Sequence, residues 1–75
     1  MYIEHLGIYG TRGYEAAEIY AIDVAFCVGY VIPAVGKQRF ATWRVIDGAR
    51  LNGPQEEDLV ALIRARDARP IPGYN

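Results

Sequence analysis

Large apolar side chains occupy every second position between Ile19 and Ile32, and the positions between them are mostly small or polar. A period of two is typical of a β-strand, because successive side chains point to opposite faces of a sheet. The stretch is also rich in β-branched and aromatic residues, which favour strands. It therefore predicts one long strand with a bulky face on the even positions and a flat face on the odd positions.

An additional helix over about residues 14–27 is the alternative for the same stretch, because residues 15–18 favour helix formation. Such a helix would be apolar almost all round from Ile19 onward, which suits a membrane or the centre of a large protein. The chain has 75 residues, so we prefer the strand. A flat strand of this length is too long for so small a domain, and we expect a bend or bulge near Gly29 or a short helical turn over 14–18.

Three further apolar stretches predict strands around this one. Residues 2–9 are expected to form the first strand, and residues 39–47 follow the long strand after a loop. Asp47 and Gly48 then predict a two-residue hairpin turn, because Asp-Gly tolerates the positive φ that such turns need. Residues 49–51 would form a short returning strand beside 39–47.

The C-terminal part of the chain predicts a helix over residues 54–69. Pro54 suits the first helical position, and acidic residues are followed by arginines, as the helix dipole favours. Leu59, Leu62 and Ile63 form an apolar stripe at helical spacing. Pro70 would end the helix, and residues 70–75 would form an extended tail.

Together these elements predict a single α+β domain over residues 1–75. We expect an antiparallel meander of three to four strands with one C-terminal helix packed on one face. The bulky face of the long strand would contact Leu59, Leu62 and Ile63. The small residues of the flat face would then stay open.

Composition limits what can stabilise this domain. The chain contains one cysteine and one histidine, so no disulfide can form within it and these two residues cannot make up a four-ligand metal site, and we expect no metal and no cofactor. Small chains are marginally stable without such aids, and 52% of the residues are hydrophobic, which favours a buried protein–protein interface.

The same features bear on cellular location. The longest uncharged run covers residues 24–36, whereas a membrane span needs about 20 residues, so we expect no membrane insertion. The N-terminus has no basic segment before an apolar run, so no signal peptide is expected. The single Cys27 suits a reducing compartment, and we expect a cytoplasmic protein.

No set of residues for catalysis can be assembled from the sequence. The chain contains no serine, and Thr11 and Thr42 have no base placed beside them. His5 is the only histidine, and we interpret it as an ordinary strand residue. Cys27 lies in the middle of an apolar stretch, where a thiol is inert. We therefore expect that the protein is not an enzyme.

A basic band in the middle of the chain is the clearest candidate for partner binding. It comprises Lys37, Arg39, Trp43, Arg44 and Arg50. Tryptophan and arginine are the commonest energetic centres of protein interfaces. Cations interleaved with aromatic residues also serve as platforms for single-stranded nucleic acid. The flat face of the long strand, with Ala21, Asp23 and Ala25, is a candidate for self-association and could form a homodimer.

The leading hypothesis is a small non-enzymatic protein-binding module that inhibits or regulates a larger protein or ribonucleoprotein by occupying its surface. In size and in its lack of catalytic chemistry, and in nothing else, the chain resembles the small inhibitors carried by phages and mobile elements, anti-CRISPR proteins among them. The alternative is a small nucleic-acid-binding domain that uses Lys37, Arg39, Arg44 and Arg50. Net charge is −1, which favours neither nucleic acid nor an anionic membrane.

Overall fold

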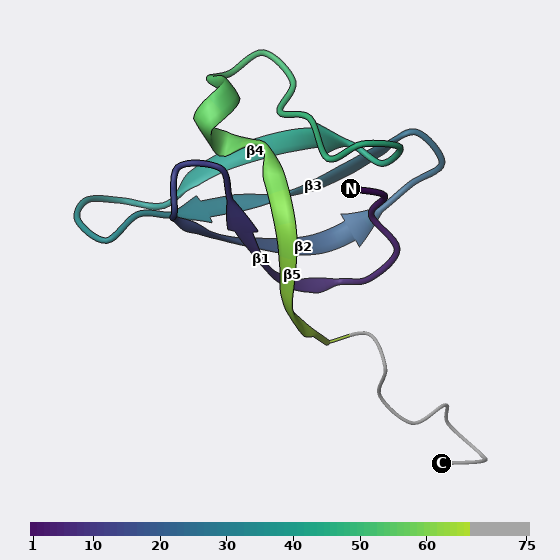
Figure 1. The fold of residues 1–75 in the computed structure, drawn as a ribbon, viewed down its shortest axis with the longest axis horizontal. Helices are drawn as coiled ribbons and strands as arrows, with labels where there is room; N and C mark the ends of the chain where they lie inside the picture. Colours follow the sequence, from purple (N-terminus) through teal and green to yellow (C-terminus); the bar gives the residue numbers. More distant parts are fainter. Residues whose placement is uncertain (67–75) are drawn as a thin grey trace.

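Five antiparallel strands make up the protein in the computed structural model, which describes residues 1–66. Their bounds are β1 Gly7–Thr11, β2 Ala16–Ile22, β3 Phe26–Ile32, β4 Arg39–Arg44 and β5 Leu59–Ala65. They form one sheet in the order β4-β3-β2-β1-β5. The first four strands form a meander, and β5 returns to the far side of β1. Figure 1 shows the resulting twist, with β5 running across the direction of β3 and β4.

The predicted α+β class is wrong, because residues 1–66 contain no α-helix and only one 3-10 turn, η1 Gln55–Glu57. The helix begins where the sequence placed it, directly after Pro54, but ends after one turn. Asp58 has an extended backbone with ψ 140°. Its carbonyl accepts a hydrogen bond from the Arg12 amide at 2.9 Å, and its side chain accepts one from the Arg50 amide at 2.8 Å. These two bonds hold the chain out of the helical path.

Residues 59–65 form a strand because β1 offers them a closely fitting partner. The two strands pair from Gly7 opposite Ala65 to Thr11 opposite Leu59. A Cβ atom added at Gly7 would overlap the carbonyl oxygen of Arg64, so only glycine permits this approach. The predicted end of the helix at Arg69 and the extended tail over 70–75 lie outside the described residues.

The long strand predicted over residues 19–32 is two strands, β2 and β3, joined by a tight turn. The Asp23 amide donates to the Phe26 carbonyl at 2.8 Å, and the Asp23 side chain accepts from the Val24 amide at 2.8 Å. Asp23 thus acts as a turn residue, as aspartate often does. The alternative helix over 14–27 is also wrong, because residues 16–22 are strand.

The two faces of this hairpin are used in the opposite way from the prediction. The small face is buried, with Ala17 and Ile19 of β2 and Cys27 and Val31 of β3 fully enclosed. The two largest buried side chains, Trp43 and Tyr9, come from other strands, and Ile3 and Leu59 complete the core. A strongly curved sheet has little room on its concave side, so small residues there leave space for Trp43 and Tyr9. The bulky face points outward.

The segment after β4 follows the predicted return. Gly48 has φ +74°, and residues 49–51 run back along the outer edge of β4. The Arg44 amide donates to the Ala49 carbonyl and the Leu51 amide to the Thr42 carbonyl, both at 2.9 Å. The position of the turn at Asp47 and Gly48 and the return of residues 49–51 are confirmed. The two-residue hairpin turn is wrong, because the turn is longer: the Gly48 amide donates to the Arg44 carbonyl at 2.8 Å. The prediction of one small domain with an antiparallel sheet is likewise confirmed.

No helix in the described part of the chain is long and apolar enough to span a membrane.

Candidate protein-binding surface

A row of aromatic rings crosses the outer face of the sheet from β2 to β4. Tyr30 of β3 lies directly opposite Phe40 of β4 in the strand register. Their ring centroids are 6.3 Å apart in an edge-to-face arrangement, and the centroids of Tyr20 and Tyr30 are 6.1 Å apart in a tilted one. Both separations lie in the range in which aromatic pairs attract each other. We call Tyr20, Phe26, Tyr30 and Phe40 the aromatic face.

A β-bulge in β2 interrupts the alternation of side chains at Tyr20. Ile19 pairs with Gly29, but Ala21 pairs with Val28, so Tyr20 has no partner on β3. The extra residue changes which side chains of β2 point inward, as bulges do. Tyr20 therefore stays on the outer face, whereas Ile22 turns inward and packs against the core.

The aromatic face is accessible to a partner. Phe40 is 79% exposed, Phe26 49% and Tyr20 43%. An open groove of about 710 Å³ runs along them and is also lined by Val28, Leu51 and Asn52. Large apolar side chains gathered on one surface mark interaction sites more often than single exposed ones do.

Polar contacts fix the orientation of the central ring. The Tyr30 hydroxyl donates to Glu18 Oε1 at 3.0 Å, and Arg66 Nη1 lies 3.2 Å from Glu18 Oε2. The hydrogen bond to Glu18 raises the pKa of Tyr30 above its ordinary value of 10.0. The ring therefore presents its apolar surface while its polar end is already paired.

The structure does not bring the five residues of the predicted basic band together as one surface. Trp43 is fully buried on the inner face of β4, and its Nε1 donates to the Glu57 carbonyl at 2.7 Å. Arg39 and Arg50 both form ion pairs of 2.8 Å with the side chain of Glu57, which is itself 5% exposed. Burial alone would raise the pKa of Glu57, but the hydrogen bonds from Arg39 and Arg50 outweigh it and lower the pKa.

The other two cations of the band lie apart from this cluster. Arg44 forms an ion pair with Asp47, and its hydrogen bond is the main cause that lowers the pKa of Asp47 to about 2. Lys37 lies exposed in the loop between β3 and β4. Partner binding by Lys37, Arg39, Trp43, Arg44 and Arg50 stays a prediction. Three of its four cations already contact carboxylates.

The residues predicted for self-association lie near one hairpin turn. Ala21, Asp23 and Ala25 are all exposed at the end of β2 and in the turn that follows. The flat face to which they were assigned is not open, because Cys27 and Gly29 are buried. Their role in a homodimer stays a prediction. The open flat face on which that prediction was based is absent, because part of this face is buried.

Cys27 and His5 are the two side chains best suited to catalytic chemistry, and they are buried and partly buried respectively. Cys27 is buried, and burial raises the pKa of its thiol to about 11, so the thiol stays protonated at neutral pH. His5 is partly buried, and its carbonyl accepts a hydrogen bond from the Tyr9 hydroxyl at 2.7 Å. Among residues 1–66 no group of three or more histidine, cysteine, aspartate or glutamate side chains is placed to hold a metal ion.

Comparison with known proteins gives no relative for this surface. No protein-family model, curated protein or solved structure matches the chain. The site therefore rests on geometry alone.

The sequence contained the signal for the aromatic face, but the prediction assigned it to the core. Tyr20, Phe26 and Tyr30 were recognised as a bulky strand face. Phe40 lies next to Arg39 in the sequence, within the segment that contains the basic band. Only the curvature of the sheet reveals that the bulky side is the convex one.

Proposed function

We propose that the protein is a non-enzymatic binding module that docks its aromatic face onto a larger protein. The observation that carries this proposal is the row of Tyr20, Tyr30 and Phe40 across three adjacent strands, in which Tyr20 and Phe40 are exposed. Tyrosine and phenylalanine provide large contact areas with little loss of side-chain entropy. Inhibition or regulation of the partner would follow from occupying its surface.

The charges around the aromatic face suggest the chemistry of the partner. Glu18 is paired with Arg66 on one side and Arg44 with Asp47 on the other. These two pairs neutralise charge on two sides of the aromatic face, while Lys37 is an exposed cation in the loop before Phe40. The partner surface that fits best is apolar at its centre and close to neutral around it.

A nucleic-acid partner is the second candidate, because exposed rings on a sheet can stack on bases. Such platforms also need cations that contact phosphates. In the described part of the chain, Arg39, Arg44 and Arg50 are engaged with carboxylates. The protein partner is therefore the better supported of the two.

Affinity capture with matched variants tests the docking surface. Phe40 is 79% exposed, so Phe40→Ser should leave the fold intact and remove a central contact. Loss of an interface centre of this kind weakens binding by about 2 kcal/mol or more, which is roughly thirtyfold. Proteins captured from the native host by the wild-type chain should be lost with Phe40→Ser.

Val35→Ser is the control for this experiment. Val35 is 90% exposed but lies in the loop between β3 and β4, outside the groove. Its substitution removes a similar amount of exposed apolar surface and should not change capture. Equal capture of the same partner by Phe40→Ser and wild type would show that the aromatic face is not the docking surface.

A further inference from the structure

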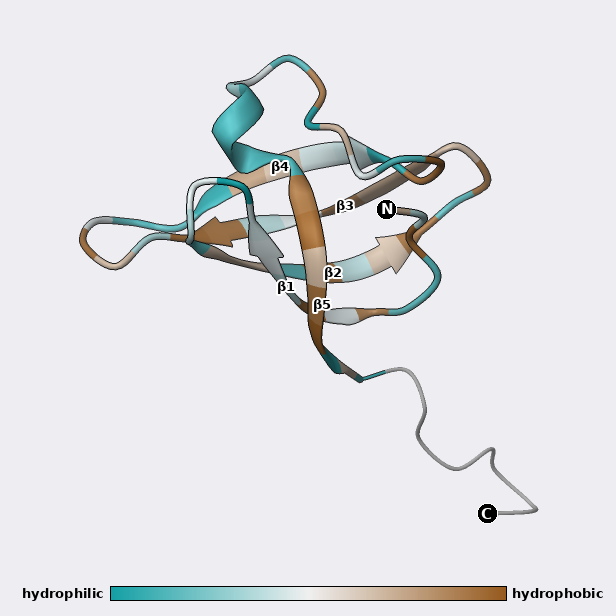
Figure 2. Ribbon diagram, viewed as in Figure 1, coloured by the Kyte–Doolittle hydropathy of each residue, from teal (hydrophilic) through white to brown (hydrophobic). Residues whose placement is uncertain are grey.

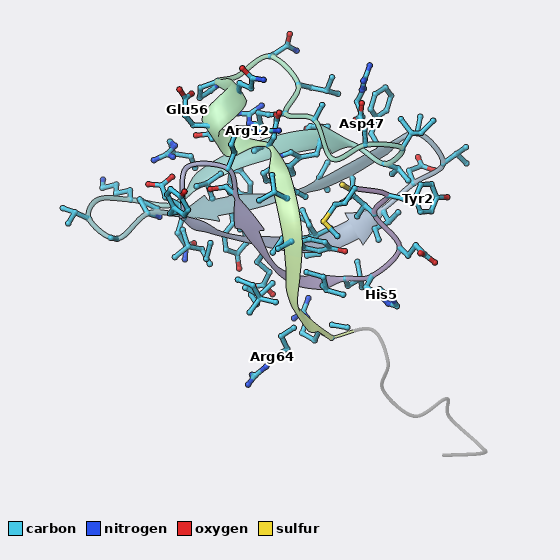
Figure 3. The ribbon with its side chains drawn as sticks, in the orientation of Figure 1. Tyr2, His5, Arg12, Asp47, Glu56 and Arg64 are labelled. Carbon is cyan, nitrogen blue, oxygen red and sulfur yellow. The ribbon has the colours of Figure 1, made fainter. Side chains whose placement is uncertain are left out.

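Arg66, the last described residue, is held beside the aromatic face. Strand β5 is apolar along most of its length and becomes polar toward its end (Figure 2), which Arg64 marks in Figure 3. The Arg66 amide donates to the Leu6 carbonyl at 2.8 Å. Its side chain reaches over the sheet to Glu18, the carboxylate that accepts the hydrogen bond of the Tyr30 hydroxyl. The chain therefore continues beyond Arg66 from a point next to the row of rings.

The sheet order sets how far a segment that starts at Arg66 must travel to reach the rings. Tyr30 lies on β3, three strands away from β5, which is about 14 Å at a spacing of about 4.8 Å per strand. An extended polyproline II segment advances about 3.1 Å per residue, so Ile71 can lie about 15 Å from Arg66. Residues 67–75 are therefore long enough to place Ile71 beside Tyr30.

The sequence of these residues is typical of ligands for aromatic grooves. Residues 67–75 read Asp-Ala-Arg-Pro-Ile-Pro-Gly-Tyr-Asn, with Ile71 between two prolines. Proline favours the polyproline II conformation and disfavours helical backbone in the residue before it. Segments of this kind dock in grooves lined by aromatic rings, because they are already extended and lose little entropy on binding. Residues 67–75 and the aromatic face are thus chemically matched.

Two polar groups in the groove suit the backbone of such a ligand. Tyr20 and Asn52 both line the groove. Within residues 1–66, neither the Tyr20 hydroxyl nor the side-chain amide of Asn52 has a hydrogen-bonding partner. A polyproline II segment makes no internal hydrogen bonds, so its carbonyl groups are free to accept from these two donors. The groove therefore offers rings to the side chains of the ligand and donors to its backbone.

We propose that residues 67–75 fold back onto the aromatic face of their own chain and compete with the partner for it. The competition rests on the proposed function, whereas the contact itself does not. The tether from Arg66 to Pro70 is short, which gives the segment an effective concentration of about 1 mM at the groove. A contact with a dissociation constant of about 100 µM would then occupy the groove in roughly nine molecules of ten. The apparent dissociation constant of the partner would rise about tenfold.

NMR spectroscopy on the full chain tests the contact directly. Nuclear Overhauser contacts should connect the Ile71 methyl groups with the rings of the aromatic face. They should be equally strong at low and high protein concentration, because the segment and the groove belong to one molecule. Ile71→Ser should remove the apolar contact and shift the amide resonances of Val28 and Thr42, which line the groove.

Ala68→Ser is the matched control, because it changes the same segment before its prolines. It should leave the amide resonances of Val28 and Thr42 as they are in the wild type. Absence of any contact between Ile71 and the aromatic face would overturn the proposal. Contacts that weaken on dilution would overturn it as well, because they would come from residues 67–75 of a second copy.

The competition is measured with the partner that the wild-type chain captures. Ile71→Ser should bind this partner about tenfold more tightly than the wild type does, and equal affinities would overturn the competition. The NMR contacts need no partner, so they are observed or lost whatever Phe40→Ser does to capture. Failure of the proposed function and failure of this inference are therefore distinguishable.

Discussion

Glu57 connects the turn η1 to strand β4 and to the returning segment. Its side chain accepts hydrogen bonds from Arg39 of β4 and Arg50 of the returning segment, and its carbonyl accepts one from Trp43. A buried carboxylate is stable only when it is paired in this way. The short turn η1 therefore places the Glu57 carboxylate between Arg39 and Arg50.

Replacing Glu57 by glutamine should destabilise the fold by about 1–3 kcal/mol, because Arg50 would lose its charged partner in a mostly buried position. The ion pair between Arg39 and Glu57 contributes little to this change in stability, since the Arg39 side chain is 47% exposed to solvent. Urea unfolding followed by circular dichroism measures the change. Glu56→Gln, on the exposed neighbour, should leave the midpoint unchanged, and a similar loss in both variants would contradict this role.

The lowered pKa of Glu57 also predicts how stability depends on pH. A carboxyl group whose pKa is lower in the folded state stabilises the fold above its ordinary pKa, here 4.5, and this contribution is lost as pH falls through the folded value. Between pH 7 and pH 3 the wild type should therefore lose more stability than Glu57→Gln. Parallel losses in the two proteins would show that Glu57 does not contribute to acid sensitivity.

At the scale of elements, β5 divides into a buried start and an exposed remainder. Leu59 is 1% exposed, whereas Leu62 is 38% exposed. Leu59→Ala should cost about 2–5 kcal/mol of unfolding free energy, as in other buried leucines. Leu62→Ala should cost less than about 1 kcal/mol. Equal costs in urea unfolding would indicate a helical arrangement like the one that the sequence suggested, with both residues in the core.

The sequence predicted the local signals of this region correctly and still gave the wrong element. Pro54 and the acids after it do begin a helical turn. What ends the turn is the pair of hydrogen bonds to Asp58, one from Arg12 in a distant part of the chain and one from Arg50 in the returning segment. Tertiary contacts of this kind override helix propensity. By contrast, the position of the turn at Gly48 could be predicted, because it depends on the positive φ of Gly48 itself and not on distant contacts.

At the scale of the whole molecule, the alternation of large and small residues was read correctly but assigned to the wrong sides. The pattern over residues 19–32 shows that two faces exist, and it cannot show which one is concave. That depends on Trp43, whose size requires small neighbours across the curved sheet. Because the sequence does not show how the sheet curves, it did not reveal that the aromatic face is exposed.

The paired charges across the molecule predict weak binding to nucleic acid. A single-stranded oligonucleotide should bind only weakly in a gel-shift assay, because within residues 1–66 most arginines already contact carboxylates and few cations are left to displace counterions from phosphates. Capture of the protein partner should change little between low and moderate salt. A tight oligonucleotide complex that is lost steeply with added salt would instead favour the nucleic-acid alternative.

The burial of Trp43 has a practical consequence. It is the only tryptophan in the chain and lies on the inner side of β4, while Tyr20 and Tyr30 lie on the outer side. Indole fluorescence should therefore report whether the interior is intact, whatever covers the convex surface. A ligand that quenches tyrosine emission without shifting the tryptophan spectrum would be bound to a folded molecule. The two kinds of chromophore therefore distinguish binding at the aromatic face from unfolding in one sample.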